Sequence, residues 1–214
     1  MAGVRLVKPR TEAGPLERPA RHGDGGPVNT PPALHNGLLA IILLIGAEVM
    51  LFMGLFGAFV LYKTASVAWP PPGQPMLPVG VTFCNTAVLL ASAMTLQRGY
   101  AKLREGDIAG LRSGLVATAV MGVVFLLVQG FEWTRLVHYG LTLASSTYGA
   151  TFYTLIGLHA AHVLAAVIWL AFVLAAAMRG RYTAQSYAGV QVFSVYWYFV
   201  CALWVVLFVA VYLA

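Results

Sequence analysis

Five long apolar runs constrain the fold of this 214-residue chain more than any other feature of its sequence. Each has at least about 20 residues, enough for a helix to cross about 30 Å of hydrocarbon. Only 9% of the residues are charged, against about 25% in a typical soluble domain. The sequence therefore predicts an all-α polytopic membrane protein, a bundle of five transmembrane helices with approximate spans 37–62, 77–97, 113–136, 149–178 and 188–213.

The prolines support these spans. All 11 lie either in residues 9–32 or in the segment 70–78, so they avoid the helix interiors that proline disrupts. Residues 1–33 are rich in Pro, Gly and Arg and are predicted to form an N-terminal tail in front of a transmembrane domain over residues 34–214. Such a composition buries too little apolar surface to order itself, so we expect a neighbouring subunit to hold the tail.

Lysine and arginine divide unequally between the two sides of the predicted bundle. The tail and the loops 98–112 and 179–187 carry 11 of them, whereas the other side has only Lys63 and Arg135. Basic loops remain in the cytoplasm, which predicts a cytoplasmic N-terminus and an external C-terminus in a bacterial inner membrane. Because the basic residues lie in the tail and loops and form no face of a soluble domain, we expect no nucleic-acid partner.

Three ionisable residues are predicted to lie near the middle of the membrane. Glu48 stands 11 residues after Gly37, about 16 Å into the first span. A charge at that depth costs about 2.5–3.5 kcal/mol on insertion scales, so the neutral carboxylic acid is favoured. His159 and His162 share one face of the fourth span at a similar depth. We expect Glu48 to form a hydrogen bond with one of them; a packing role alone is the alternative.

Metal ligands are too few for a redox centre. The other histidines, His22, His35 and His138, lie in the tail or at span ends, so neither a bis-histidine haem site nor a three-histidine copper site can be completed. Cys84 and Cys201 have no CxxC spacing and are expected to be small buried apolar side chains. We therefore expect no catalytic residue, metal or cofactor in this chain.

Two further patterns concern packing. Glu132 and Arg135, three residues apart near the outer end of the third span, are expected to form an ion pair at the membrane interface. Small residues at a spacing of four, such as Gly54 and Ala58, are typical of helices whose backbones approach closely.

Three segments together resemble subunit III of the haem–copper terminal oxidases, in its short five-helix form. They are GAEVMLFMGLFGAFVLY (46–62), YGATFYTLIGLHAAHV (148–163) and VYWYFVCALWVVLF (195–208), and the resemblance extends over residues 34–214. The last segment differs from the family pattern at two places, where Tyr198 replaces a usual His and Cys201 a usual Asp. The family motif positions in it are Tyr196, Trp197, Tyr198, Cys201 and Trp204.

The resemblance implies a non-catalytic subunit that packs beside the oxidase subunit I, with haem and copper in the partner subunits. It also implies bound phospholipid, support of proton uptake and protection of the oxidase during turnover. One alternative within the family is the homologous helper protein encoded with nitric oxide reductases. Alternatives from other classes are a secondary transporter with Glu48 as its coupling site and a b-type cytochrome, which the histidine count disfavours. The electron donor of the oxidase, cytochrome c or quinol, is left open.

Overall fold

The computed structural model describes residues 33–73, 75 and 77–213, and among them it confirms the predicted all-α fold, with five helices long and apolar enough to span a membrane. A π-helical turn, Val209–Leu213, continues the last helix. The predicted tail lies outside the described residues except for Ala33, which begins the first helix. The helices are α1 (Ala33–Ala65), α2 (Val79–Arg104), α3 (Ile108–His138), α4 (Thr147–Met178) and α5 (Ala188–Phe208).

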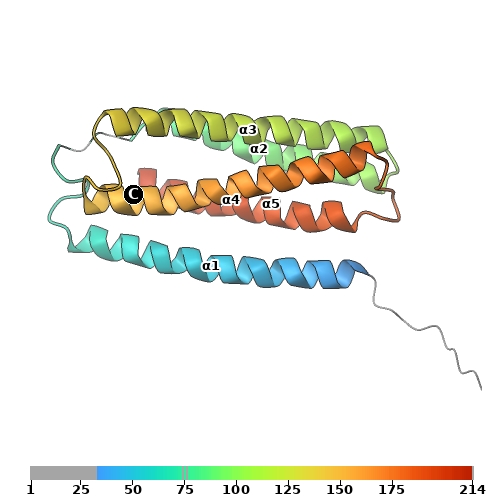
Figure 1. Ribbon diagram of the computed structural model, residues 1–214, viewed down its shortest axis with the longest axis horizontal. Helices are drawn as coiled ribbons and strands as arrows, with labels where there is room; N and C mark the ends of the chain where they lie inside the picture. The colour runs from blue at the N-terminus through green and yellow to red at the C-terminus, as the bar shows by residue number, and fades with distance from the viewer. Residues whose placement is uncertain (1–32, 74, 76, 214) are drawn as a thin grey trace, which may run out of the picture. The chain divides into compact units, whose positions relative to one another are not determined.

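Four of the helices form a closed ring. Helix α2 packs against α3 and α5, and α4 completes the ring by packing against the same two helices. Helix α1 packs against α4 and α5 from outside this ring, on the side away from α2 and α3 (Figure 1). The ring therefore contains most of the buried side chains, whereas α1 is attached along one face only.

The connection between α2 and α3 is much shorter than predicted. Residues 98–112 were assigned to a loop, but α2 continues to Arg104 and α3 begins at Ile108. The apolar run ends before the helix does, because lysine and arginine are good helix formers once the chain leaves the hydrocarbon. Gly106 takes a φ of 87° in the remaining turn, a conformation that favours glycine. The Asp107 side chain then caps α3 by accepting a hydrogen bond from the Gly110 amide at 2.8 Å.

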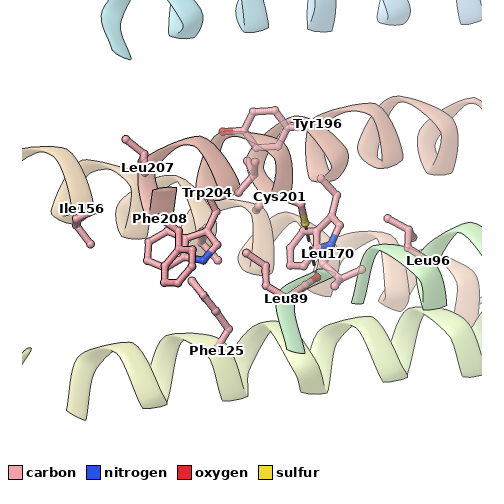
Figure 2. Packing of buried hydrophobic residues seen from close by; sticks show 14 of the residues in the cluster. Leu89, Leu96, Phe125, Ile156, Leu170, Tyr196, Cys201, Trp204, Leu207 and Phe208 are labelled. Atoms are coloured by element: carbon pink, nitrogen blue, oxygen red, sulfur yellow. Dashed lines mark hydrogen bonds between the residues drawn. The ribbon is translucent and has the colours of Figure 1, made fainter. Parts of the chain in front are cut away.

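Helix α2 turns its hydroxyl groups inward, where two tryptophans of α5 meet them. The indole N–H of Trp197 donates to Ser92 Oγ at 3.1 Å, and that of Trp204 donates to Thr86 Oγ1 at 2.9 Å. Trp204 also packs edge-on against Phe125 of α3, with ring centroids 5.1 Å apart (Figure 2). A single side chain of α5 thus contacts both α2 and α3.

Helices α2 and α3 approach each other closely at a pair of glycines that the spacing of small residues does not indicate. A methyl group added to Gly114 of α3 would lie 2.7 Å from the Cα of Gly99 in α2, so the two backbones touch. By contrast, nothing lies within 4 Å of the position a methyl group would take on Gly54, and Ala58 is exposed. Among the described residues, the pair in α1 therefore makes no close contact between helix backbones.

Candidate functional site: a carboxyl between three helices

The carboxyl of Glu48 lies where α1 meets α4 and α5. Glu48 is 8% exposed to solvent. The Tyr196 hydroxyl of α5 donates to Glu48 Oε1 at 3.2 Å, and His162 Nε2 of α4 lies 3.7 Å from the same oxygen. We call these three residues the Glu48 site. It is built from three helices that are far apart in the sequence, so it exists only when α1 is docked.

One face of α1 positions the carboxyl. Phe52, one turn after Glu48, is also buried and packs edge-on against His162 with ring centroids 5.3 Å apart. Residues four apart on a helix share a face. The polar contacts of Glu48 and the aromatic contact of Phe52 therefore both hold the same face of α1 against α4 and α5. The ring contact also fixes the orientation of the imidazole beside the carboxyl.

The hydrogen bond at the other ring nitrogen assigns the tautomer of His162. Its Nδ1 lies 2.7 Å from the Leu158 carbonyl oxygen, which can only accept, so Nδ1 carries a proton. In the neutral imidazole Nε2 then has a free lone pair, and this lone pair faces Glu48 Oε1. The separation of 3.7 Å exceeds a hydrogen bond, and a shift of a few tenths of an ångström would close it.

His159 lies apart from Glu48, although it is only three residues from His162. It is fully buried and stacks on Trp204, with ring centroids 5.1 Å apart. Neither of its ring nitrogens has a hydrogen-bond partner within the described part of the chain. Side chains three residues apart on a helix point about 60° away from each other around its axis. This difference is enough for His162 to face α1 while His159 faces the interior of the ring.

The C-terminal end of α3 contains an ion pair. Arg135 Nη1 lies 3.0 Å from Glu132 Oε1. Glu132 is 4% exposed, whereas the Arg135 side chain is about half exposed, so the pair reaches from the protein interior to the surface. Nearby, Gln129 donates to the hydroxyl of Tyr212 at 3.2 Å. The Gln129–Tyr212 hydrogen bond connects α3 to the π-helical turn after α5.

The two cysteines occupy different environments. Cys201, which replaces the family's usual Asp, is buried, and its thiol donates to the Leu89 carbonyl of α2 at 3.8 Å (Figure 2). The expectation of burial is wrong for Cys84, which is exposed on α2. An apolar run in a membrane chain supplies both core and lipid-facing positions, so hydrophobicity alone does not separate them. All five motif positions lie on α5, four of them buried and Tyr198 half-buried.

Sequence reasoning missed the hydroxyl of Tyr196 as a partner of Glu48. The sequence identifies Tyr196 only as a family motif position. The search for polar partners of Glu48 compared the membrane depth of ionisable residues, and the neutral phenol was not among them. It also missed the inward hydroxyls of α2, because serine and threonine do not interrupt an apolar run. Among residues 33–73, 75 and 77–213, no three His, Cys, Asp or Glu side chains come together where they could hold a metal ion.

The fold and the site define a multi-pass helical membrane protein with a carboxyl buried between three of its helices. A family model described as cytochrome c oxidase subunit III matches residues 28–214. The chain belongs to the cytochrome c oxidase subunit III family, which confirms the resemblance. This membership implies association with other oxidase subunits and favours an oxidase role over the transporter alternative.

Relatives from distant organisms agree with this assignment. A cytochrome c oxidase subunit 3 from Synechocystis is 32% identical over 93% of this chain and 88% of the relative. A probable cytochrome c oxidase subunit 3 from Nocardia farcinica is 38% identical over 80% and 84% of the two chains. A cytochrome c oxidase subunit 3 from Pelomedusa subrufa is 33% identical over 86% of this chain and 72% of that longer relative.

Proposed function

We propose that this chain is the non-catalytic subunit III of a proton-pumping haem–copper oxidase in a bacterial inner membrane. It packs on subunit I, assists proton uptake and preserves activity over many turnovers. The observation that carries the proposal is the Glu48 site, a carboxyl and an imidazole that face each other where α1 docks. An ionisable residue within a membrane span is costly and by default indicates function.

The geometry suits the site to holding one exchangeable proton. With Nδ1 of His162 bonded to a carbonyl, a proton between Glu48 Oε1 and His162 Nε2 can reside on either group. The neutral pair and the carboxylate–imidazolium pair have the same total charge, so moving the proton leaves the net charge of the site unchanged. The Tyr196 hydroxyl donates to the carboxyl and stabilises it when it is ionised.

Proton exchange with this site requires an opening. Glu48 Oε2 is buried and has no hydrogen-bond partner among the described residues. A proton therefore reaches the carboxyl only if α1 shifts from α4 and α5 or if a partner subunit supplies a polar path beside it. A subunit of this kind acts on proton supply and leaves oxygen reduction to the partner that holds haem and copper.

Two grooves beside α1 support phospholipid binding as part of this role. The groove between α1 and α4 has a volume of about 650 Å³ and is lined partly by hydroxyls, including those of Tyr62, Thr147 and Thr151. The groove between α1 and α5 has a volume of about 290 Å³ and is lined by apolar side chains, including Phe56 and Phe199. Acyl chains fit the chemistry of both grooves, and lipid there would hold α1 against the ring.

Purification of the assembly through this chain tests the proposal. Mass spectrometry is expected to find a larger membrane subunit, and the assembly is expected to show haem and copper spectra. The isolated chain is expected to show no Soret band, because its histidines cannot complete a haem site. A Soret band from the isolated folded chain, or purification without an oxidase subunit, would contradict the proposal.

The proposed orientation has its own test. With the N-terminus in the cytoplasm, a cysteine at Arg104→Cys should resist a membrane-impermeant thiol reagent on intact cells and react after lysis. The control is Tyr139→Cys beyond α3, which should react on intact cells; both variants are made in a Cys84→Ser background. Labelling of the Arg104→Cys variant on intact cells would reverse the topology.

A further inference from the structure

A pocket with polar and aromatic walls lies at the end of the bundle where α1 ends and α4 begins. Its volume is about 340 Å³. Five parts of the chain meet around it: the end of α1, the segment that follows, the start of α2, the start of α4 and the π-helical turn. The lining residues that give the pocket its chemical character are Lys63, Trp69, Val79, Tyr148 and Tyr212. We call it the Tyr148 pocket.

The hydroxyl of Tyr148 is a hydrogen-bond donor without an acceptor in the described part of the chain. Tyr148 is only 4% exposed, and it lines the pocket. Among the described residues its hydroxyl takes part in no hydrogen bond, unlike the hydroxyls of Tyr153, Tyr196 and Tyr212. Buried polar groups normally have a partner, so this donor favours a ligand that carries an acceptor atom.

Tyr212 supplies a second phenol to the same pocket. It is 8% exposed, and its oxygen accepts a hydrogen bond from Gln129 at 3.2 Å. A phenol that accepts one hydrogen bond still has its own proton to donate. The pocket therefore offers two phenol donors, one of which is held in position by a hydrogen bond from α3.

The charge around the pocket is positive. Lys63 is the only charged residue in the lining, and no ion pair engages it within the residues that the structure describes. Glu132, three residues after Gln129 on α3, is already paired with Arg135 at 3.0 Å. Helix α2 begins at Val79 in the lining, and no side chain caps it. The positive end of its dipole therefore adds to the charge of Lys63.

The apolar part of the pocket includes a fixed aromatic wall. Trp69 packs edge-on against Phe59 of α1 and against Tyr148, with ring centroids 5.7 Å and 5.1 Å apart. These two contacts hold the indole in place without a ligand. Leu77 and Val211 line the pocket as well. An aromatic ring or a short hydrocarbon group suits such walls, whereas an inorganic anion would leave them unfilled.

We propose that the Tyr148 pocket binds a small organic acid through its carboxylate. The carboxylate would accept hydrogen bonds from Tyr148 and Tyr212 and pair with Lys63, and the apolar part of the acid would lie against Trp69. A small molecule is favoured because five parts of one chain already surround the pocket. The inference does not depend on the proposed oxidase role.

The test measures ligand binding to the full-length chain in detergent by fluorine NMR. The five tryptophans are replaced by 5-fluorotryptophan, and the variant Trp69→Phe identifies the Trp69 resonance. Benzoate is titrated, and benzamide, which has nearly the same shape without the charge, is the matched ligand. Benzoate should shift the Trp69 resonance to saturation. Benzamide should bind at least about tenfold more weakly, because hydrogen bonds to a charged group are the stronger ones.

Two variants test the groups that would hold the carboxylate. Tyr148→Phe keeps the ring that packs on Trp69 but removes the donor, and Lys63→Gln removes the cation. Each should weaken benzoate binding about tenfold. The matched controls are Tyr139→Phe, an exposed phenol at the end of α3, and Lys102→Gln, at the opposite end of α2 from the pocket. Each control should change the affinity by less than about twofold, because charges this far apart are screened.

Four outcomes would overturn parts of the proposal, and unchanged resonances of the other tryptophans show that each variant keeps its fold. Benzamide binding as tightly as benzoate would overturn the anion site. Equal losses in Lys63→Gln and Lys102→Gln would show a diffuse charge effect and overturn it too. Displacement of benzoate by an equal concentration of inorganic phosphate would overturn the choice of an organic acid. Benzoate binding to the isolated chain but not to its purified assembly would replace the free acid by a carboxylate of a partner subunit.

Discussion

Helices α1 and α2 are attached to the molecule in different ways. Helix α2 is fixed by a Gly–Gly backbone contact with α3, by indole–hydroxyl hydrogen bonds from α5, and by Asn85, which donates to the Phe125 carbonyl at 3.1 Å. Helix α1 is attached by the Glu48 site and a few apolar side chains. In the most apolar 18-residue stretch of each helix, 17% of the residues are buried in α1 and 33% in α2.

The difference shows what stabilises a helix among other helices in lipid. Helix α1 is the more hydrophobic of the two, yet it is the less buried. Lipid tails are as apolar as leucine, so hydrophobicity keeps a helix in the membrane and does not attach it to its neighbours. Close backbone packing and interhelical hydrogen bonds do attach it, and α2 has both. Helix α1 is therefore the least buried of the five described helices, and it carries the ionisable site.

The largest expected effect follows from filling the Gly–Gly contact. Gly114→Val should lower the free energy of unfolding by about 3 kcal/mol, because the added side chain meets the backbone of α2, which cannot move aside cheaply. The control is Gly54→Val on α1, where the new side chain finds open space and should change stability by less than about 1 kcal/mol. Both are measured by equilibrium unfolding of the isolated chain in micelles. Equal effects would show that α1 and α2 are packed alike.

A smaller effect is expected from the indole–hydroxyl bond between α5 and α2. A double-mutant cycle with Trp204→Phe and Thr86→Val should give a coupling energy of about 1 kcal/mol in unfolding experiments. Trp133→Phe is the matched control, since the indole nitrogen of Trp133 has no partner among the described residues. If Trp133→Phe costs as much as Trp204→Phe, packing of the ring and not the hydrogen bond stabilises this contact.

The smallest effect on stability should come from the contact that attaches α1. Tyr196→Phe removes the hydrogen bond to Glu48 and should change the free energy of unfolding by about 0.6 kcal/mol, the average for interhelical hydrogen bonds in lipid. It should nevertheless broaden the distance distribution between spin labels at Leu61→Cys on α1 and Leu164→Cys on α4, in a Cys84→Ser background.

The control for that measurement is Tyr139→Phe, which removes an exposed phenol from the end of α3. Its distance distribution should match that of the unmodified parent. An unchanged distribution in Tyr196→Phe would mean that the apolar contacts alone hold α1 in place.

The sequence was sufficient to predict the number and class of the helices, because apolar run length and proline placement depend on the membrane alone. It misplaced the α2–α3 turn, since hydropathy ends at Arg98 whereas the helix continues to Arg104. Contacts between helices were harder to predict, because they depend on the rotation of each helix about its axis. Depth placed Glu48 near two histidines, but only the structure distinguishes His162, which faces it, from His159, which does not.

Under the proposed function, Glu48 contributes through its proton and not through its shape. Glu48→Gln keeps the size of the side chain and its hydrogen-bonding groups but cannot exchange a proton. The measurement is oxygen consumption and proton release by the purified complex in vesicles over many turnovers. Glu132→Gln, which neutralises the second glutamate that is buried among the described residues, is the matched control and should behave as wild type. The Glu48→Gln complex should assemble fully but pump protons, or sustain turnover, modestly less well than wild type; wild-type values for both would show that the Glu48 proton is not needed.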